Sequence, residues 1–338
     1  MGVDRLPPLI DTPLSSYRLT DNLSATSGRI FLTGTQALVR LALTQSALDR
    51  RRGWNTAGFI SGYRGSPLGM VDQQLWKASQ ALDEAGIRFL PAINEELGAT
   101  AVLGTQRVES DPQRTVDGVF AMWYGKGPGV DRAGDALKHG NAYGSSPHGG
   151  VLVVAGDDHG CVSSSMPHQS DQTLIAWQMP VVNPSNVAEM LEFGLYGWAL
   201  SRYSGAWVGF KAISETVESG STVDLDDLCT HWPAPDHVSD VPGGFVPPVD
   251  GLHNRWPDLP NLAIEARLAA KLDAVRHFAR MRSIDKWIAP SAGATVGIVT
   301  CGKAHLDLME ALRRLGLTVA DLDAAGVRVY KVGLSFPL

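Results

Sequence analysis

The chain has 338 residues, of which 44% are hydrophobic and 19% charged, and a formal net charge of −6; this composition is typical of globular proteins with a sizeable core, and the length allows two or three domains. It contains no dense Lys/Arg tract and no apolar run of about 18 residues, so we expect no nucleic acid partner and no membrane contact. Cys161, Cys229 and Cys301 are far apart and odd in number, which argues against disulfides, zinc motifs and iron–sulfur motifs and indicates a reducing, cytoplasmic location.

Short apolar runs alternate with helical patterns from residue 28 onward. The first run, residues 28–34, leads into a helix with one apolar face, formed by Ala37, Leu38, Leu41, Ala42 and Leu48, at the spacing of an amphipathic helix. Strands that alternate with helices of this length predict an α/β fold with a mostly parallel sheet and helices on both faces. Further strands are expected within residues 55–62, 88–93, 117–123, 149–159, 179–184 and 205–212.

The C-terminal third has a different composition. Residues 231–260 are rich in proline and are interpreted as a linker or insertion, because proline interrupts regular elements. A helix at about 262–283 follows, and then a strand, a helix and a last strand over 327–338. We therefore expect an N-terminal extension (1–27), a main domain (28–230), the linker (231–262) and a small, truncated C-terminal α/β domain (263–338), which a continuation or partner completes.

Four segments near the expected strand ends carry glycine or polar residues. In open α/β sheets the loops at the carboxyl ends of the strands border the crevice that binds ligands, and loops on a rigid sheet often carry function. The segments are SGYRGSPLG (61–69), NEE (94–96), GKGPG (125–129) and GDDHGCVSSSMPHQSDQ (156–172).

Each segment has an alternative interpretation. Glu95 is the candidate for acid–base chemistry, because a carboxyl group among apolar neighbours has a raised pKa and can exchange a proton with a ring nitrogen; helix capping is its alternative role. GKGPG can equally be a tight turn. The segment 156–172 can be a solvated connection without a binding role. A Mg²⁺ site that combines the acids of GDD with Asn183 is disfavoured, because Asp158 stands where that motif requires glycine.

Taken in order, FLTGTQALVR and these four segments resemble the pyrimidine-binding domain of the 2-oxoacid:ferredoxin oxidoreductases, and most closely the indolepyruvate ferredoxin oxidoreductases. The likeness covers residues 17–220, and residues 294–338 resemble the transketolase C-terminal-like domain of that family. It implies a thiamine diphosphate-binding fold. It also implies oxidative decarboxylation of a 2-oxoacid, such as an arylpyruvate, to an acyl-coenzyme A, with electrons passed to ferredoxin.

The resemblance assigns roles to individual residues. Glu95 matches the catalytic glutamate that hydrogen-bonds the aminopyrimidine ring of thiamine diphosphate. Arg64 replaces a proline of the family motif, and Gln172 stands where some relatives have arginine, so the group that binds the substrate carboxylate stays open. The cofactor-binding residues implied are Glu95, Gly65, Gly127, Pro128 and Gly129, and the substrate-binding residues are Tyr63, Arg64, Ser66, Ser164, Ser165 and Gln169.

Parts of such an enzyme are expected outside this chain. The sequence has no Cys-rich motif, so we expect no metal site here, and Mg²⁺ and the [4Fe-4S] clusters belong to a thiamine diphosphate-domain continuation or a partner subunit. The isolated chain should bind the cofactor weakly, and a homo-oligomer is expected. Two other interpretations are a non-catalytic or regulatory remnant and a nucleotide-binding dehydrogenase, the latter disfavoured because the first strand–helix turn lacks GxGxxG.

Overall fold

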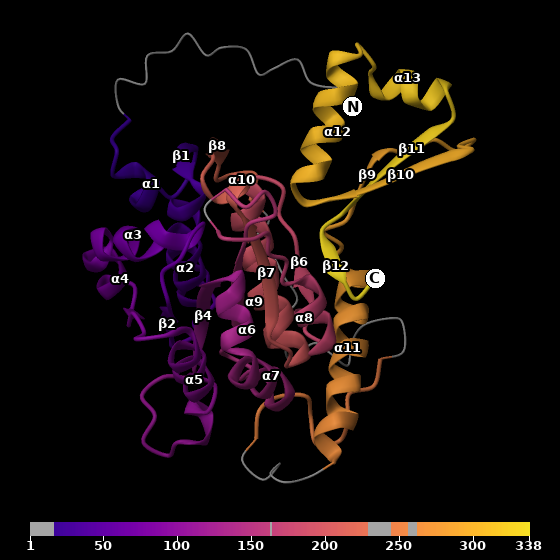
Figure 1. Ribbon diagram of the computed structural model, residues 1–338. Coiled ribbons are helices and arrows are strands. Elements are labelled where there is room, and N and C mark those ends of the chain that lie inside the picture. Colours follow the sequence, from indigo (N-terminus) through magenta and orange to yellow (C-terminus); the bar gives the residue numbers. More distant parts are fainter. Residues whose placement is uncertain (1–16, 163, 229–244, 256–261) are drawn as a thin grey trace.

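The computed structural model describes residues 17–162, 164–228, 245–255 and 262–338. Within these ranges the largest sheet has seven strands in the order β12-β6-β7-β5-β4-β2-β3, and Figure 1 labels five of them, β12, β6, β7, β4 and β2. Neighbouring strands pair in parallel except for β12, which is antiparallel to β6, so the mostly parallel α/β fold is confirmed. The strands are β2 (Thr56–Gly62), β3 (Ile87–Phe89), β4 (Gly118–Lys126), β5 (Val151–Asp157), β6 (Val181–Val182), β7 (Val208–Ile213) and β12 (Leu334–Phe336).

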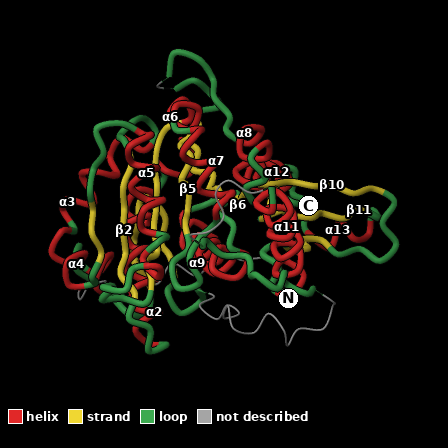
Figure 2. The backbone as a smooth tube through the Cα atoms, turned by 90° about the horizontal axis from the view of Figure 1, so that it is seen from below, coloured by secondary structure: helices red, strands yellow, loops and turns green. Residues whose placement is uncertain are grey.

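Helices cover both faces of this sheet, and Figure 2 shows the strands between the two helical layers. Side chains of β4 alternate between two buried clusters: Phe120, Met122 and Tyr124 belong to one, and Ala121 and Trp123 to the other. β5 is buried along its whole length, as expected for a strand with both faces covered. The first cluster includes residues of α2 (Gly34–Arg51), α3 (Val71–Lys77), α9 (Val187–Ser204) and α11 (Ala263–Met281); the second includes residues of α5 (Glu95–Thr105), α6 (Gly127–Arg132), α7 (Gly134–Tyr143) and α8 (Asp171–Ala176).

Shorter helical segments connect these elements. The predicted apolar face of the helix after residue 34 is confirmed, because Ala37, Leu38, Leu41, Ala42 and Leu48 of α2 are all buried. The remaining helices are α1 (Asp21–Ser24), α4 (Ser79–Glu84), α10 (Ser214–Val217), α12 (Gly302–Arg314) and α13 (Val319–Ala324), with two 3₁₀ turns, η1 (Leu68–Met70) and η2 (Val108–Ser110).

The first predicted strand does not join the parallel sheet. Instead, β1 (Arg29–Thr33) pairs antiparallel with β8 (Gly220–Asp224) in a two-stranded sheet of its own. Burial alternates along β1, with Phe31 exposed and Leu32 buried, and this alternation suits a ribbon with one solvated face rather than a central parallel strand. The expectation that residues 28–34 start the parallel sheet was therefore wrong.

The last predicted strand is divided between two sheets. Residues 327–332 form β11, which lies between β10 (Val296–Cys301) and β9 (Lys286–Ala289) in a three-stranded sheet, at the upper right of Figure 1. At Gly333 the chain turns: the backbone N–H groups of Gly333 and Leu334 donate to Asp285 Oδ1 at 2.7 and 3.1 Å. The chain then continues as β12 in the large sheet, so the single strand expected over 327–338 is corrected to two.

A buried ion pair attaches this C-terminal unit to the large sheet. Lys331 of β11 pairs with Glu189 of α9 and donates to Ser185 Oγ at 2.7 Å. Most of the proline-rich segment and Cys229 lie outside the described residues, and the described part, 245–255, contains no helix or strand. No helix in the described ranges has the length and apolar character needed to span a membrane.

Candidate functional site

Glu95 begins α5, directly beyond the carboxyl end of the sheet. Asn94 caps the helix, since its side-chain oxygen accepts from the N–H of Leu97 at 2.9 Å, and Trp123 Nε1 donates to the Glu95 carbonyl at 2.9 Å. The Glu95 side chain is 12% exposed, whereas Glu96 is exposed. Of the two neighbouring acids, the first is therefore the one held against the protein.

The glycine-rich turn after β4 lies against Glu95. A Cβ atom at Gly129 would stand 2.7 Å from Glu95 Cγ and 2.9 Å from Oε1, so the carboxyl group occupies space that only glycine leaves open. Arg132, at the end of α6, brings its Nε to 3.6 Å from Glu95 Oε2. GKGPG thus forms the end of β4 and the first turn of α6, and that turn contacts the candidate acid.

The loop after β2 lies over the ends of β4 and β5. A Cβ at Gly65 would be 2.7 Å from Lys126 Cδ, and a Cβ at Gly156 would be 3.2 Å from Pro67 Cδ. Tyr63 is 39% exposed and Arg64 is exposed. The loop is therefore packed at its glycine and its proline, while its tyrosine and arginine side chains reach solvent.

Ser66 lines an open cavity of about 610 Å³ beside this loop. The cavity is also lined by Thr33, Thr35 and Gln36 of the first sequence motif, FLTGTQALVR, and by Glu218. No site residue was predicted within that motif. Thr33 and Gln36 form the capping box of α2: the Thr33 hydroxyl oxygen accepts from the backbone N–H of Gln36. This hydroxyl group therefore already makes one hydrogen bond within the protein.

The polar loop after β5 is closed at its base by a bridge between Asp158 and His168. Ser164 is half-buried, and its carbonyl accepts from Cys161 Sγ at 2.7 Å. Ser165 and Gln169 are exposed. In the described part of this loop, the side chain that reaches α6 is instead His168, with Nε2 at 2.9 Å from Asp131 Oδ2.

A chain of charged groups at the ends of β5 and β7 was not foreseen. Asp157 is fully buried and accepts from the N–H and hydroxyl of Ser170 at 3.0 and 2.7 Å. Lys211 of β7 lies 3.6 Å from Asp157 Oδ2 and pairs with Asp171. A buried lysine within a strand was the available signal, since lysine is rarely buried without a partner.

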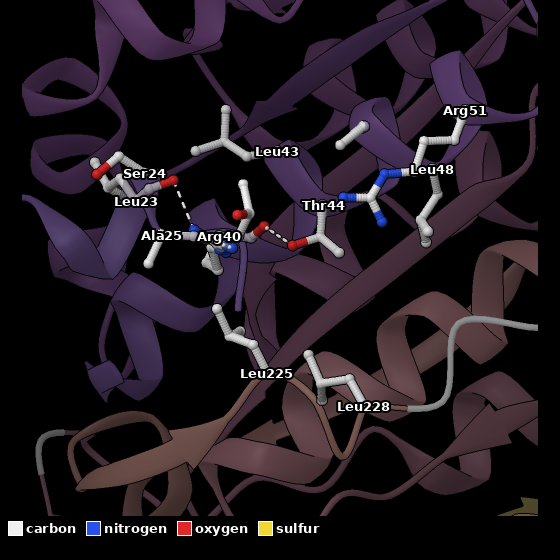
Figure 3. A pocket seen from close by; sticks show the side chains of 12 residues that line it. Leu23, Ser24, Ala25, Arg40, Leu43, Thr44, Leu48, Arg51, Leu225 and Leu228 are labelled. Atoms are coloured by element: carbon white, nitrogen blue, oxygen red, sulfur yellow. Dashed lines mark hydrogen bonds between the residues drawn. The ribbon is translucent and has the colours of Figure 1, made fainter. Parts of the chain in front are cut away.

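Two further observations limit the chemistry of the site. Burial and the hydrogen bond to Asp72 raise the pKa of Tyr124, so this phenol stays protonated beneath the strand ends. Among the described residues, no three His, Cys, Asp or Glu side chains gather in a way that can hold a metal ion. A second cavity, of about 210 Å³, is lined by α1, α2 and the segment after β8 (Figure 3), and none of the predicted site residues lines it.

Known proteins resemble this chain over most of its length. Residues 286–338 match the family model described as "Indolepyruvate oxidoreductase domain". The chain is 24% identical over 323 residues to the indolepyruvate oxidoreductase subunit IorA of Methanothermobacter marburgensis, and 25% identical over 316 residues to subunit IorA of Pyrococcus abyssi. These alignments cover 94% and 92% of this chain but 45% and 42% of the relatives, so the chain spans less than half of their length.

One solved structure supports the fold. The 2-oxoglutarate:ferredoxin oxidoreductase from Magnetococcus marinus, solved with 2-oxoglutarate, coenzyme A and succinyl-CoA bound, matches with a TM-score of 0.63 and 17% identity. The match covers 92% of this chain and 55% of that one. Together these comparisons confirm the resemblance to the indolepyruvate oxidoreductases and the α/β fold class.

Proposed function

Because the chain resembles the indolepyruvate oxidoreductases along nearly its whole length, we propose that it supplies the pyrimidine-binding half of a thiamine diphosphate-dependent 2-oxoacid oxidoreductase. The enzyme oxidatively decarboxylates a 2-oxoacid, such as indolepyruvate or another arylpyruvate, to an acyl-coenzyme A and passes electrons to ferredoxin. The observation that carries the proposal is the Glu95 carboxyl group, 12% exposed and seated against Gly129 at the carboxyl end of the sheet.

Glu95 is proposed to meet the pyrimidine ring beside the start of α6. Gly127, Pro128 and Gly129 form the first turn of this helix. The space that a Cβ atom would fill is taken by His168 at Gly127 and by Glu95 at Gly129, so the two glycines let these side chains pack directly on the turn. Gly65 is packed on Lys126 in the neighbouring loop. In this proposal Glu95 shares a proton with a ring nitrogen of the pyrimidine, and the two loops hold the ring beside it.

When bound, thiamine diphosphate supplies a carbon nucleophile for attack on the keto group of the substrate. The contribution of this chain is to orient the ring and to hold a proton at the Glu95 carboxyl. The Glu95 side chain is 12% exposed, and Arg132 Nε lies 3.6 Å from its Oε2. A ring nitrogen that binds Glu95 would therefore lie beside this guanidinium.

The cavity beside Ser66 is the proposed substrate site. Its volume of about 610 Å³ is within the range of small-molecule pockets, and Ser66, Thr33 and Thr35 give its wall hydroxyl groups. Arg64 and Tyr63 reach solvent on the same loop and are proposed to meet the substrate carboxylate or its aryl group. Ser164, Ser165 and Gln169 lie on the polar loop after β5 and are proposed to border the entrance.

Exposed apolar side chains support the proposal that another domain or subunit completes the site. Ile93 and Leu97, on either side of Glu95, are 84% and 51% exposed, and Val162 and Met166 of the polar loop are 70% and 68% exposed. Apolar groups gathered around a polar centre often mark a protein interface. We propose that a continuation or partner subunit, in a homo-oligomeric assembly, covers them and contributes the diphosphate and Mg²⁺ site, the [4Fe-4S] clusters and the coenzyme A site.

A comparison of adjacent glutamates tests the proposal. In the assembled enzyme, Glu95→Gln should reduce deuterium exchange at the cofactor C2 position, and 2-oxoacid-dependent dye reduction, by at least about 100-fold, the scale of general acid–base catalysis. Glu96→Gln is the matched control, because Glu96 is the next residue and is exposed; it should leave both rates unchanged. Full exchange activity in Glu95→Gln would refute the assignment.

A further inference from the structure

The side chain of His168 is packed on the first turn of α6. A Cβ at Gly127 would lie 2.0 Å from His168 Nδ1 and 2.4 Å from its Cγ, so the imidazole ring rests directly on the glycine. One helical turn later, Asp131 Oδ2 lies 2.9 Å from His168 Nε2. The ring is 17% exposed. Gly127 therefore contacts the His168 ring by packing, and Asp131 contacts it through a hydrogen bond.

The ring also faces a buried carboxylate at the end of β5. Nδ1 lies 3.5 Å from Asp157 Oδ1, and in the described chain this nitrogen is buried without a hydrogen-bond partner. Asp157 is fully buried, and its two oxygens accept from Ser170 while Lys211 lies 3.6 Å away. The backbone N–H of His168 donates to the carbonyl of Asp158, the residue after β5, at 3.2 Å, so His168 connects the end of this central strand to α6.

The same short helix holds Glu95 by a second pair of residues. Gly129 leaves the space for the Glu95 side chain, and Arg132 approaches its carboxyl at 3.6 Å. Gly129 lies two positions after Gly127, and Arg132 lies one position after Asp131. α6 has six residues and is about 9 Å long, so the residues that contact His168 and those that contact Glu95 lie within one short helix.

We propose that His168 and Asp131 are a positioning pair that sets the place of Glu95 through α6. The pair acts on α6, whose glycine and arginine contact the acid, and the backbone bridge of His168 to Asp158 joins the pair to the sheet. The inference rests on the proposed function only for its effect on catalysis; the mechanical coupling of His168, α6 and Glu95 is a property of the chain itself.

The coupling can be measured on the chain by NMR. With ¹³C-labelled glutamate, the Glu95 carboxyl signal is identified by its loss in Glu95→Gln, and it should shift in Asp131→Ala. Asp135→Ala is the matched control, because Asp135 makes a similar contact with His139, at 3.3 Å, on the exposed side of α7. Asp135→Ala should leave the signal in place. Asp131→Asn, which keeps an acceptor for His168 Nε2–H, should give an intermediate shift.

A steric test uses the contact at Gly127. Gly127→Ala should move the Glu95 signal as Asp131→Ala does, because the new methyl group and the imidazole cannot occupy the same space. His168→Ala removes the ring, so the double substitution Gly127→Ala/His168→Ala should return the signal toward that of His168→Ala alone. Additive shifts of the two substitutions would contradict direct contact through the ring.

In the assembled enzyme, Asp131→Ala should reduce C2 exchange by about tenfold or more, the scale of a small misplacement of a catalytic group, with less change in the substrate KM. Suppose that Glu95→Gln abolishes C2 exchange, whereas Asp131→Ala leaves both the exchange rate and the Glu95 signal unchanged. The positioning pair is then refuted, and the proposed function stands. If Glu95→Gln retains exchange, the proposed function fails, and the NMR shifts alone decide the coupling.

Discussion

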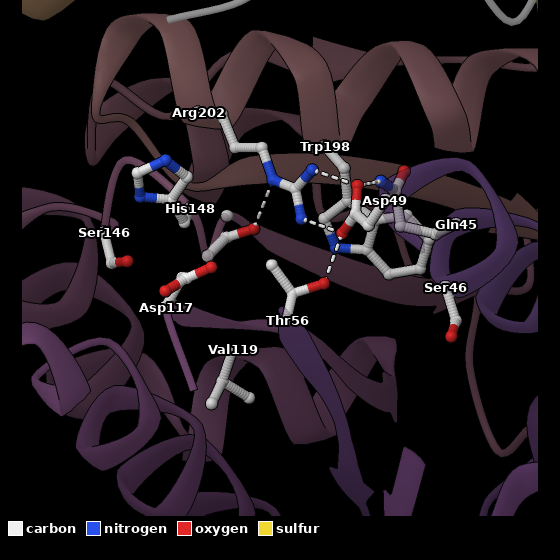
Figure 4. Close-up of polar contacts among 12 residues, drawn as sticks. Gln45, Ser46, Asp49, Thr56, Asp117, Val119, Ser146, His148, Trp198 and Arg202 are labelled. Atoms are coloured by element: carbon white, nitrogen blue, oxygen red, sulfur yellow. Dashed lines mark hydrogen bonds and ion pairs between the residues drawn. The ribbon is translucent and has the colours of Figure 1, made fainter. Parts of the chain in front are cut away.

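Asp49 and Arg202 form a fully buried ion pair between α2 and α9 (Figure 4). Arg202 Nη1 and Nη2 donate to the two oxygens of Asp49 at 2.7 and 2.6 Å, and its Nε donates to the Gly149 carbonyl at 2.8 Å. Asp49 also accepts from Thr56 Oγ1 at 2.7 Å. Both charged groups are therefore engaged on all sides, with side chains 0% and 2% exposed for Asp49 and Arg202.

The expected cost of Asp49→Ala follows from this burial. The substitution leaves the guanidinium inside the protein without its carboxylate, and loss of one partner of a buried pair costs about 3–5 kcal/mol. Replacement of both members by apolar residues removes the uncompensated charge. The double substitution Asp49→Leu/Arg202→Met should therefore cost less than Asp49→Ala alone, although Thr56, the Gln45 amide and the Gly149 carbonyl each lose a partner at about 1 kcal/mol.

Thermal and denaturant unfolding of the single and double variants measure the two costs. C2 exchange, expressed per folded molecule in the assembled enzyme, should be unchanged, because neither residue lines the Ser66 cavity or contacts Glu95 in the described structure. If the double variant is destabilised as much as the single one, the cost comes from lost packing or hydrogen bonds, and the reasoning from an unpaired buried charge is wrong.

Two other predictions follow from contacts near and below the site. Gly129→Ala should destabilise the protein by about 1–3 kcal/mol, because the new Cβ would stand 2.7 Å from Glu95 Cγ and would force a shift. Gly104→Ala, on α5 in the same helical layer, is the control: its new Cβ has no atom within 4 Å, so it should stabilise the protein by about 0.4–1 kcal/mol. The free energies of unfolding of the two variants measure the difference. The hydrogen bond with Glu109 raises the pKa of His148, so this histidine contributes stability that is fully present below pH ~6.5 and is lost as the pH rises through the folded value. His148→Gln should then destabilise the protein more at pH 6 than at pH 9, and an equal cost at both pH values would contradict the role of the imidazolium.

The buried strands could be predicted from sequence because each is a local apolar run. β5 is the clearest case, since Val151–Asp157 is apolar until its last residue and is buried throughout. β1 is also a local apolar run, but its partner β8 is nearly 200 residues away in sequence, and sequence pattern alone does not specify such a pairing. The division of β11 from β12 was missed for a similar reason, because it depends on the contact of Asp285 with Gly333.

For the candidate site, sequence order could indicate which loops meet but not which side chains touch. Gly129 and Glu95 were both predicted from the resemblance, and the structure brings them into contact; their roles stay predictions. His168 lies within the predicted polar loop, but no role was assigned to it from the sequence. Its contacts, Asp131 and Asp157, lie 37 and 11 residues before it in the sequence, so no local spacing could have revealed them.

Two carboxyl groups at the strand ends, Glu95 and Asp157, have opposite environments, and this contrast explains why the chemistry is assigned to only one of them. Asp157 accepts two hydrogen bonds from Ser170, and Lys211 and His168 lie within 3.6 and 3.5 Å, so its oxygens are occupied by the protein. For the Glu95 side chain, the described structure records one ion-pair contact, with Arg132 at 3.6 Å, and Arg132 is itself 57% exposed. Because the Arg132 member of this pair is exposed, water can solvate its guanidinium when a ligand replaces it beside Glu95. Asp157, in contrast, cannot release its partners without leaving buried charges unpaired.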